Sequence, residues 1–287
     1  MRIVDPRSFN KIQQPKSRLK VGFWLAIILI GVAGSIVLFW PQSSQKQEGT
    51  SETVTSSVNE PSKVVENVDN VKDTLRIFSD NEFKSFYDNL LLPNLLKVEN
   101  PPVITGNDIA DARIRKIAED RGYRLRSSSS VELKDVEGNL LQTQVAENWK
   151  SLKATAVSKG LKISIVSGYR SVETQRSLFL QRLSVSGESI ESVASGKSDA
   201  KVNELLATTS IPGYSKHHTG YTIDILCAGY VFENFKNSPC NDWIKADNYK
   251  VAKENGFIPS YPPLADAQGP DPEAWEYVWV GTELLYE

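Results

Sequence analysis

The pattern of hydrophobic and polar residues divides the chain into three parts. Residues 21–40 are apolar and include no ionisable side chain. Residues 41–74 are mostly polar, with no aromatic residue and only scattered valines. From Leu75 onward, apolar residues recur at helical intervals or alternate with polar ones, which is typical of a folded domain of helices and strands.

The first apolar run predicts a transmembrane helix over residues 21–40, because about 20 helical residues cross a hydrocarbon core of roughly 30 Å. Lysine and arginine dominate the ionisable residues of 1–20. This asymmetry predicts a cytoplasmic N-terminal tail and a single-pass membrane protein whose remainder lies on the periplasmic or cell-wall side. A cleaved signal peptide is the alternative, but signal-peptide cores usually span only ~7–15 residues. We therefore favour an uncleaved anchor.

Residues 41–74 are expected to form a disordered linker, since so few apolar side chains cannot offset the entropy of ordering. The folded part, residues 75–287, predicts an α+β domain. Helical spacing indicates helices over residues 79–91, 107–121, 143–159, 172–183, 199–207 and 241–255. Alternation indicates strands over residues 123–126, 161–166, 222–226 and 273–281. Residues 127–130, 184–196 and 261–272 are expected to be loops.

Charge and cysteine content add two constraints. The net charge of −2 gives no signature of nucleic-acid binding. The lysines and arginines of the folded part are interpreted as scattered, solvated positions. Cys227 and Cys240 lie beyond the apolar run, where an oxidising compartment permits a disulfide. Two free thiols are the alternative, because the sequence does not show whether the Cα atoms come close enough.

Both histidines of the chain lie between Ser215 and Asp224. A hydrolytic zinc site needs about three protein ligands, one open position and a general base nearby. His217 and Asp224 can provide an imidazole nitrogen and a carboxylate oxygen. Taken alone, such a pair is more often a satisfied polar pair or a solvated turn than half of a metal site.

Three blocks of sequence strengthen the metal hypothesis through a family resemblance. Residues 215–224 resemble the Ser-x-His-x-x-Gly-x-Ala-x-Asp motif of VanY-type D,D-carboxypeptidases, which belong to the LAS group of zinc peptidases. Residues 167–171 with Gln175 resemble that family's Ser-Gly-Tyr-Arg-Ser…Gln block, and residues 273–281 are similar to its Glu-Pro-Trp-His-x-Arg-Tyr-Val-Gly block. The resemblance implies a LAS/hedgehog-type fold, with a small central antiparallel sheet flanked by helices.

The resemblance also implies residue roles. His217 and Asp224 match the first two zinc ligands, and Glu273 matches the carboxylate that activates the attacking water. Arg170 matches an arginine that binds substrate or stabilises a developing oxyanion. The candidate substrate-binding residues are Ser215, Gln175, Tyr169 and Ser167, although packing is the commoner role for a tyrosine such as Tyr169.

One departure from the family pattern concerns the third zinc ligand. The resemblance calls for a histidine after the tryptophan, where this chain has Glu276. Three interpretations stay open. Glu276 completes a His/Asp/Glu site for Zn²⁺ or another divalent metal, or His218 supplies the missing ligand, although it and His217 point to opposite faces of an extended segment. In the third, the site no longer binds metal well. We favour Glu276.

The expected function follows from the resemblance and the anchor. The protein is expected to remove the C-terminal D-alanine from peptidoglycan stem peptides as a D,D- or L,D-carboxypeptidase. The alternative is a catalytically impaired peptidoglycan-binding or regulatory domain of the same fold. The sequence predicts no oligomeric state.

Overall fold

The computed structural model describes residues 74–262 and 267–287. The predicted cytoplasmic tail 1–20 and transmembrane helix 21–40 lie outside these residues, as does the predicted linker except for its last residue. Within the described part of the chain, every helix is too short or too polar to cross a membrane.

A four-stranded antiparallel sheet, in the order β5-β6-β8-β7, carries the residues of interest. Its strands are β5 (Ile163–Ser167), β6 (Thr222–Cys227), β8 (Glu276–Trp279) and β7 (Phe257–Pro259). Two smaller antiparallel pairs join β1 (Leu95–Leu96) to β2 (Ser128–Ser129) and β3 (Lys134–Val136) to β4 (Asn139–Leu141). This arrangement confirms the predicted α+β class with small antiparallel sheets.

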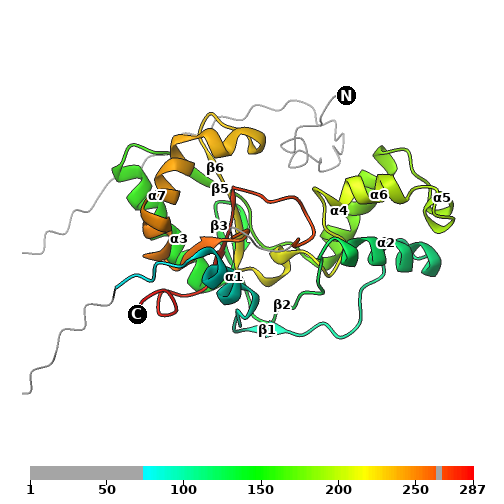
Figure 1. The fold of residues 1–287 in the computed structure, drawn as a ribbon, viewed down its shortest axis with the longest axis horizontal. Helices are drawn as coiled ribbons and strands as arrows, with labels where there is room; N and C mark the ends of the chain where they lie inside the picture. The colour runs from blue at the N-terminus through cyan, green and yellow to red at the C-terminus, as the bar shows by residue number, and fades with distance from the viewer. Residues whose placement is uncertain (1–73, 263–266) are drawn as a thin grey trace, which may run out of the picture. The chain divides into compact units, whose positions relative to one another are not determined.

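The main helices form two groups, each with its own apolar cluster (Figure 1). The group that packs with the sheet contains α3 (Thr143–Ser158) and α7 (Pro239–Lys253). The other group contains α2 (Asp108–Asp120), α4 (Val172–Val185), α5 (Ile190–Ala194) and α6 (Asp199–Leu206). Three short helices complete the described elements: α1 (Asp80–Asp88) and the 3₁₀ helices η2 (Lys216–Thr219) and η3 (Phe232–Asn237).

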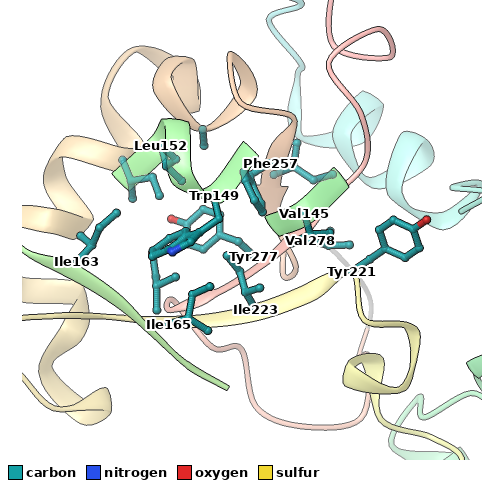
Figure 2. Packing of buried hydrophobic residues seen from close by; sticks show 14 of the residues in the cluster. Val145, Trp149, Leu152, Ile163, Ile165, Tyr221, Ile223, Phe257, Tyr277 and Val278 are labelled. Atoms are coloured by element: carbon teal, nitrogen blue, oxygen red, sulfur yellow. The ribbon is translucent and has the colours of Figure 1, made fainter. Parts of the chain in front are cut away.

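Trp149 of α3 lies at the centre of the sheet-side core (Figure 2). It is fully buried and shares the cluster with Ile165 of β5 and Tyr277 of β8. Full burial of one such apolar side chain contributes roughly 1.5–3 kcal/mol. The indole Nε1 donates a hydrogen bond of 2.9 Å to Oε1 of the exposed Glu137, so its one polar group is satisfied at the edge of the core. This core fixes the sheet from one side.

Strand register brings polar residues into one row across the sheet. Successive side chains of a strand point to opposite faces, so Ile223 and Ile225 of β6 enter the core while Asp224 faces away from it. Asp224 pairs with Ser167 of β5 on one side and with Glu276 of β8 on the other. Residues directly opposite each other on antiparallel strands share a face. The sheet therefore places the two carboxylates side by side.

Three local predictions were wrong. Residues 123–126 form no strand, because Arg126 N donates to the Gly213 carbonyl of a loop and not to a neighbouring strand. The strand nearby is β2, inside the segment predicted to be a polar loop. The predicted loop 184–196 contains α5, whose first turn is capped when Ser189 accepts a hydrogen bond from Ser192 N.

Helix α7 begins earlier than predicted and is interrupted. Ser238 caps it by accepting from Asn241 N, and Pro239 occupies the first turn, where a missing N–H costs nothing. Asp247, Asn248 and Tyr249 then adopt positive φ angles of 52°, 57° and 61°. Hydrophobic spacing carries no signal for such a left-handed turn in non-glycine residues.

A disulfide joins Cys227 at the end of β6 to Cys240 in the first turn of α7, with the two Cα atoms 5.7 Å apart. The half-cystines are separated by 13 positions, and closing a loop of that size is worth about 3 kcal/mol.

We expect a Cys227→Ala/Cys240→Ala variant to lose about this much free energy of unfolding in urea titrations. A reducing agent should lower the wild-type value similarly and leave the variant unchanged. Equal stability of the oxidised wild type and the variant would contradict the prediction.

Candidate active site

His217 reaches the polar row from the short helix η2. The Ser215 hydroxyl caps this helix by accepting from His217 N at 3.3 Å, and Gly220 ends it in the left-handed conformation with φ 72°. His217 Nδ1 lies 2.7 Å from the Gly168 carbonyl oxygen. Because a carbonyl oxygen only accepts, we assign a proton to Nδ1, so that Nε2 is the nitrogen that faces the sheet and can take up a second proton or a metal cation.

His217 Nε2 faces both carboxylates of the row. It lies 3.3 Å from Asp224 Oδ2 and 3.5 Å from Glu276 Oε2. One ligand atom from each of the three residues lies within 4.8 Å of the others, and all three residues are buried. Asp224 Oδ1 is also buried and, in the described part of the protein, has no hydrogen-bond partner.

These features fit a divalent cation. Like charges directly opposite each other in a sheet are unfavourable, and a buried acceptor without a partner costs about 1–3 kcal/mol. A cation held by His217 Nε2 and the two carboxylates would relieve both costs. One imidazole nitrogen and two carboxylate oxygens suit zinc, and the second carboxylate also suits harder divalent ions.

The pKa values in the row have opposing causes. Burial lowers the pKa of His217, but the charge of Asp224 and hydrogen bonds to Asp224 and Glu276 outweigh it and raise that pKa to about 10. Burial raises the pKa of Glu276, but the charge of Lys216 and contacts with His217 hold it well below its usual range. The two carboxylates therefore favour a positive charge beside His217 Nε2, whether a proton or a metal cation.

Glu273 lies three residues before Glu276 in the segment that leads into β8. A turn joins the two residues, with Glu276 N donating to the Glu273 carbonyl at 3.2 Å. The Glu273 residue is half-buried. Burial, followed by the negative charges of Glu276 and Asp224, raises the pKa of Glu273 well above its usual range. A carboxyl group in this environment accepts and releases protons more readily near neutral pH.

Arg121 fixes the segment that precedes Glu273. Its Nε donates to the Gly269 carbonyl at 2.9 Å and its Nη2 to Asp271 Oδ1 at 3.1 Å. Asp271 N in turn donates to the Ala207 carbonyl at 2.9 Å. These contacts hold the segment against the C-terminal ends of helices α2 and α6. They restrain the backbone that precedes Glu273.

Arg170 follows strand β5 and is oriented by two side chains. Its Nη1 donates to Gln175 Oε1 and its Nη2 to Ser167 Oγ, both at 2.9 Å. Gln175 also donates to the Ser210 carbonyl at 2.5 Å and is fully buried. Gln175 and the buried, capping Ser215 thus support neighbouring residues and have almost no exposed surface for a ligand. Tyr169 is half-buried, and its backbone N–H donates to the Leu140 carbonyl at 2.7 Å.

The family model of VanY, D-alanyl-D-alanine carboxypeptidase, matches residues 138–282, which is just over half of the 287-residue chain and includes every residue of the candidate site. The chain belongs to this family.

The chain is also similar to one curated protein and to several solved structures. The Bacillus subtilis (strain 168) protein described as putative carboxypeptidase YodJ is 28% identical over 150 residues, covering 51% of this chain and 48% of the relative. The chain thus spans about half the length of the curated relative it matches. Similar solved structures include VanYB in complex with D-alanine-D-alanine, at 25% identity and a TM-score of 0.41, covering 54% of this chain and 80% of that one. The LdcB LD-carboxypeptidase has the same identity and TM-score, covering 55% and 67% respectively.

Sequence reasoning missed one residue that contacts the polar row of the VanY domain. Lys216 was interpreted as solvated, but its side chain is only 8% exposed and its Nζ lies 3.1 Å from Glu276 Oε1. The partners that bury it come from distant segments, so no local signal marks it. The one available hint was its position beside His217.

His218 holds two loops of the VanY domain together and does not face the polar row. Its Nδ1 donates to the Arg170 carbonyl at 2.6 Å, and its Nε2 accepts from Gly213 N at 3.0 Å. Both ring nitrogens therefore have backbone partners inside a fully buried side chain. This geometry contradicts the interpretation of His218 as the third metal ligand.

The same contacts predict an acid-sensitive step in stability. Burial lowers the pKa of His218 to about 4, with further lowering by His217 and Arg170 and opposition from the Arg170 carbonyl and from Glu173. The unfolded value is about 6.5, so between these values the unfolded chain binds more protons. The His218 contribution is complete above pH 6.5 and is lost as the pH falls towards 4, by on the order of 3 kcal/mol.

We expect the metal-free wild type to be more stable than a His218→Gln variant at pH 7, with the difference shrinking towards pH 4. Urea unfolding at several pH values measures this difference. Other titrating groups are common to both proteins and cancel. A difference in unfolding free energy that does not change between pH 7 and pH 4 would rule out His218 as the cause.

Proposed function

We propose that this protein is a metal-dependent carboxypeptidase that removes the C-terminal D-alanine from peptidoglycan stem peptides. The observation that carries the proposal is the convergence of His217 Nε2, the Asp224 carboxylate, whose Oδ1 is buried without a partner among the described residues, and Glu276 Oε2. Glu273 is close enough for its pKa to be raised by the charges of Glu276 and Asp224. Membership of the VanY family supports the substrate class. The predicted anchor over residues 21–40 would hold the domain at the outer face of the cell membrane, within reach of the cell wall.

His217, Asp224 and Glu276 would hold the cation. When bound, a divalent cation supplies Lewis acidity that polarises the scissile carbonyl and makes a water molecule easier to deprotonate. Glu273 accepts the proton of the attacking water and passes it to the leaving amine of D-alanine. The products are the shortened peptide, with a new carboxylate, and free D-alanine.

Arg170 contributes a fixed positive charge to this reaction. Its guanidinium is held in orientation by Gln175 and Ser167. It is suited to bind the terminal carboxylate of the substrate or to stabilise negative charge that develops on the carbonyl oxygen.

The full-length protein in detergent provides the test. We expect stoichiometric divalent metal by elemental analysis and release of D-alanine from stem peptides that end in D-Ala-D-Ala or in a single D-alanine after an L-centre. A chelator should abolish release, and added zinc should restore it. Comparing the two peptides decides between D,D and L,D cleavage. If neither peptide is cleaved by metal-loaded protein, a wall-binding or regulatory role replaces the proposed activity.

A further inference from the structure

Lys216 places a buried ammonium group next to a candidate metal ligand. Its Nζ donates to Glu276 Oε1 and to the Ser260 carbonyl, both at 3.1 Å. The same nitrogen lies 3.4 Å from the centre of the Tyr261 ring, which adds a cation–π contact. Lysine is almost never buried unless it is paired. The position therefore needs an explanation beyond chance placement.

The two carboxylate oxygens of Glu276 have different partners. Oε1 accepts from Lys216, while Oε2 faces His217 Nε2 at 3.5 Å. The ammonium thus restrains the carboxylate so that one oxygen points to the site of Asp224 and His217. Without this contact the carboxylate could rotate and present both oxygens.

The ammonium also balances charge. Asp224 and Glu276 carry two negative charges, which Lys216 reduces to a net of one, with His217 neutral as a ligand. Two neutral imidazoles and one carboxylate, a common donor set for catalytic zinc, carry the same net charge. The Lys216–Glu276 pair therefore has the same net charge as one neutral ligand.

We propose that Lys216 is a positioning residue for Glu276: it restrains Oε1 and offsets the carboxylate's charge so that Oε2 serves as the third ligand of a divalent cation. This inference rests on the metal site of the proposed function. It makes residues 216 and 276 interdependent. A histidine at position 276 would leave the Lys216 ammonium buried, without a carboxylate partner and close to the cation.

Zinc affinity measured by competition with a chromophoric chelator tests this interdependence in the full-length protein. We expect Glu276→His to bind zinc about tenfold or more weakly than the wild type, because the ammonium then opposes the cation. Adding Lys216→Met to that variant should restore most of the affinity. Adding Lys216→Arg should not, because the positive charge is kept. This arginine variant is the matched control for a change of side chain at the same position.

The Lys216→Met single variant gives a second readout. We expect this variant to retain zinc. The acid limb of its profile of kcat/KM against pH should move to higher pH, because the negative charge of Glu276, no longer offset by Lys216, opposes the loss of a proton from the active site. Lys216→Arg should restore the wild-type profile. Thermal unfolding identifies any variant that fails to fold, and Lys216→Gln then replaces Lys216→Met.

The outcomes separate this inference from the proposed function. If Glu276→His binds zinc as tightly as the wild type, or if Lys216→Met does not improve it, the role of Lys216 is wrong. If the wild type and variants follow the expected order of affinity but release no D-alanine, the proposed activity is wrong and the role of Lys216 stands.

Discussion

Glu273→Gln is expected to lower kcat/KM for D-alanine release by roughly 10²- to 10⁴-fold, the usual contribution of a general acid–base residue. Glutamine keeps the size and polarity of the side chain but cannot take up the proton of the attacking water. The backbone contact between Glu273 and Glu276 does not involve the side chain. The substitution should therefore leave the ligand positions intact, and zinc stoichiometry should not change.

The exposed Glu283 supplies a control for this experiment. It lies beyond the end of β8 and its side chain is exposed, so Glu283→Gln should retain wild-type activity. Measuring zinc content beside D-alanine release separates loss of the base from loss of the metal. Retention of more than a tenth of wild-type activity by Glu273→Gln would mean that another group moves the proton.

Strongly periodic segments of the fold could be predicted from sequence. The helix predicted over residues 143–159 is observed over 143–158, because Trp149 and its apolar neighbours recur at helical spacing and fill one face. Strand β6 was expected over 222–226 and extends to Cys227. In both cases the apolar pattern that identifies the element is the same one that buries it.

Elements that depend on distant partners could not be predicted. Strands β1 and β2 contain only two residues each and exist because residues 95–96 meet residues 128–129. Two residues are too few to show the alternation of apolar and polar side chains that identifies a strand. The left-handed turn at Asp247–Tyr249 was likewise missed, because it lies inside a segment of helical hydrophobic spacing and ends on a tyrosine, although aspartate and asparagine tolerate positive φ better than most residues.

In the candidate site, too, residues marked by a local sequence pattern could be predicted, and a residue whose burial depends on distant partners could not. The sequence blocks brought His217, Asp224 and Glu276 together in prediction, and the structure places one ligand atom of each within 4.8 Å of the others. Their roles as ligands stay predictions. Lys216 could not be recognised, because its burial depends on Ser260 and Tyr261, which β7 and its following segment bring from elsewhere in the chain.

Arg170→Lys is the second substitution with a large expected effect, a loss of roughly 10²- to 10³-fold in kcat/KM. Arginine satisfies Gln175 and Ser167 with two nitrogens of one planar group, at 2.9 Å each. A lysine ammonium is a single point on a flexible stem and cannot hold both contacts while facing a substrate. Metal binding should persist, because Arg170 contacts His217 only through the backbone.

The kinetic form of this loss identifies what Arg170 binds. If the guanidinium holds the substrate carboxylate equally in the ground state and the transition state, KM rises and kcat is unchanged; if it stabilises charge that develops during the reaction, kcat falls. Exposed Arg124 provides the matched control, and Arg124→Lys should behave as the wild type. If Arg170→Lys has the kcat and KM of the wild type, a single positive charge is enough for catalysis. The planar guanidinium held by Gln175 and Ser167 would then serve packing alone.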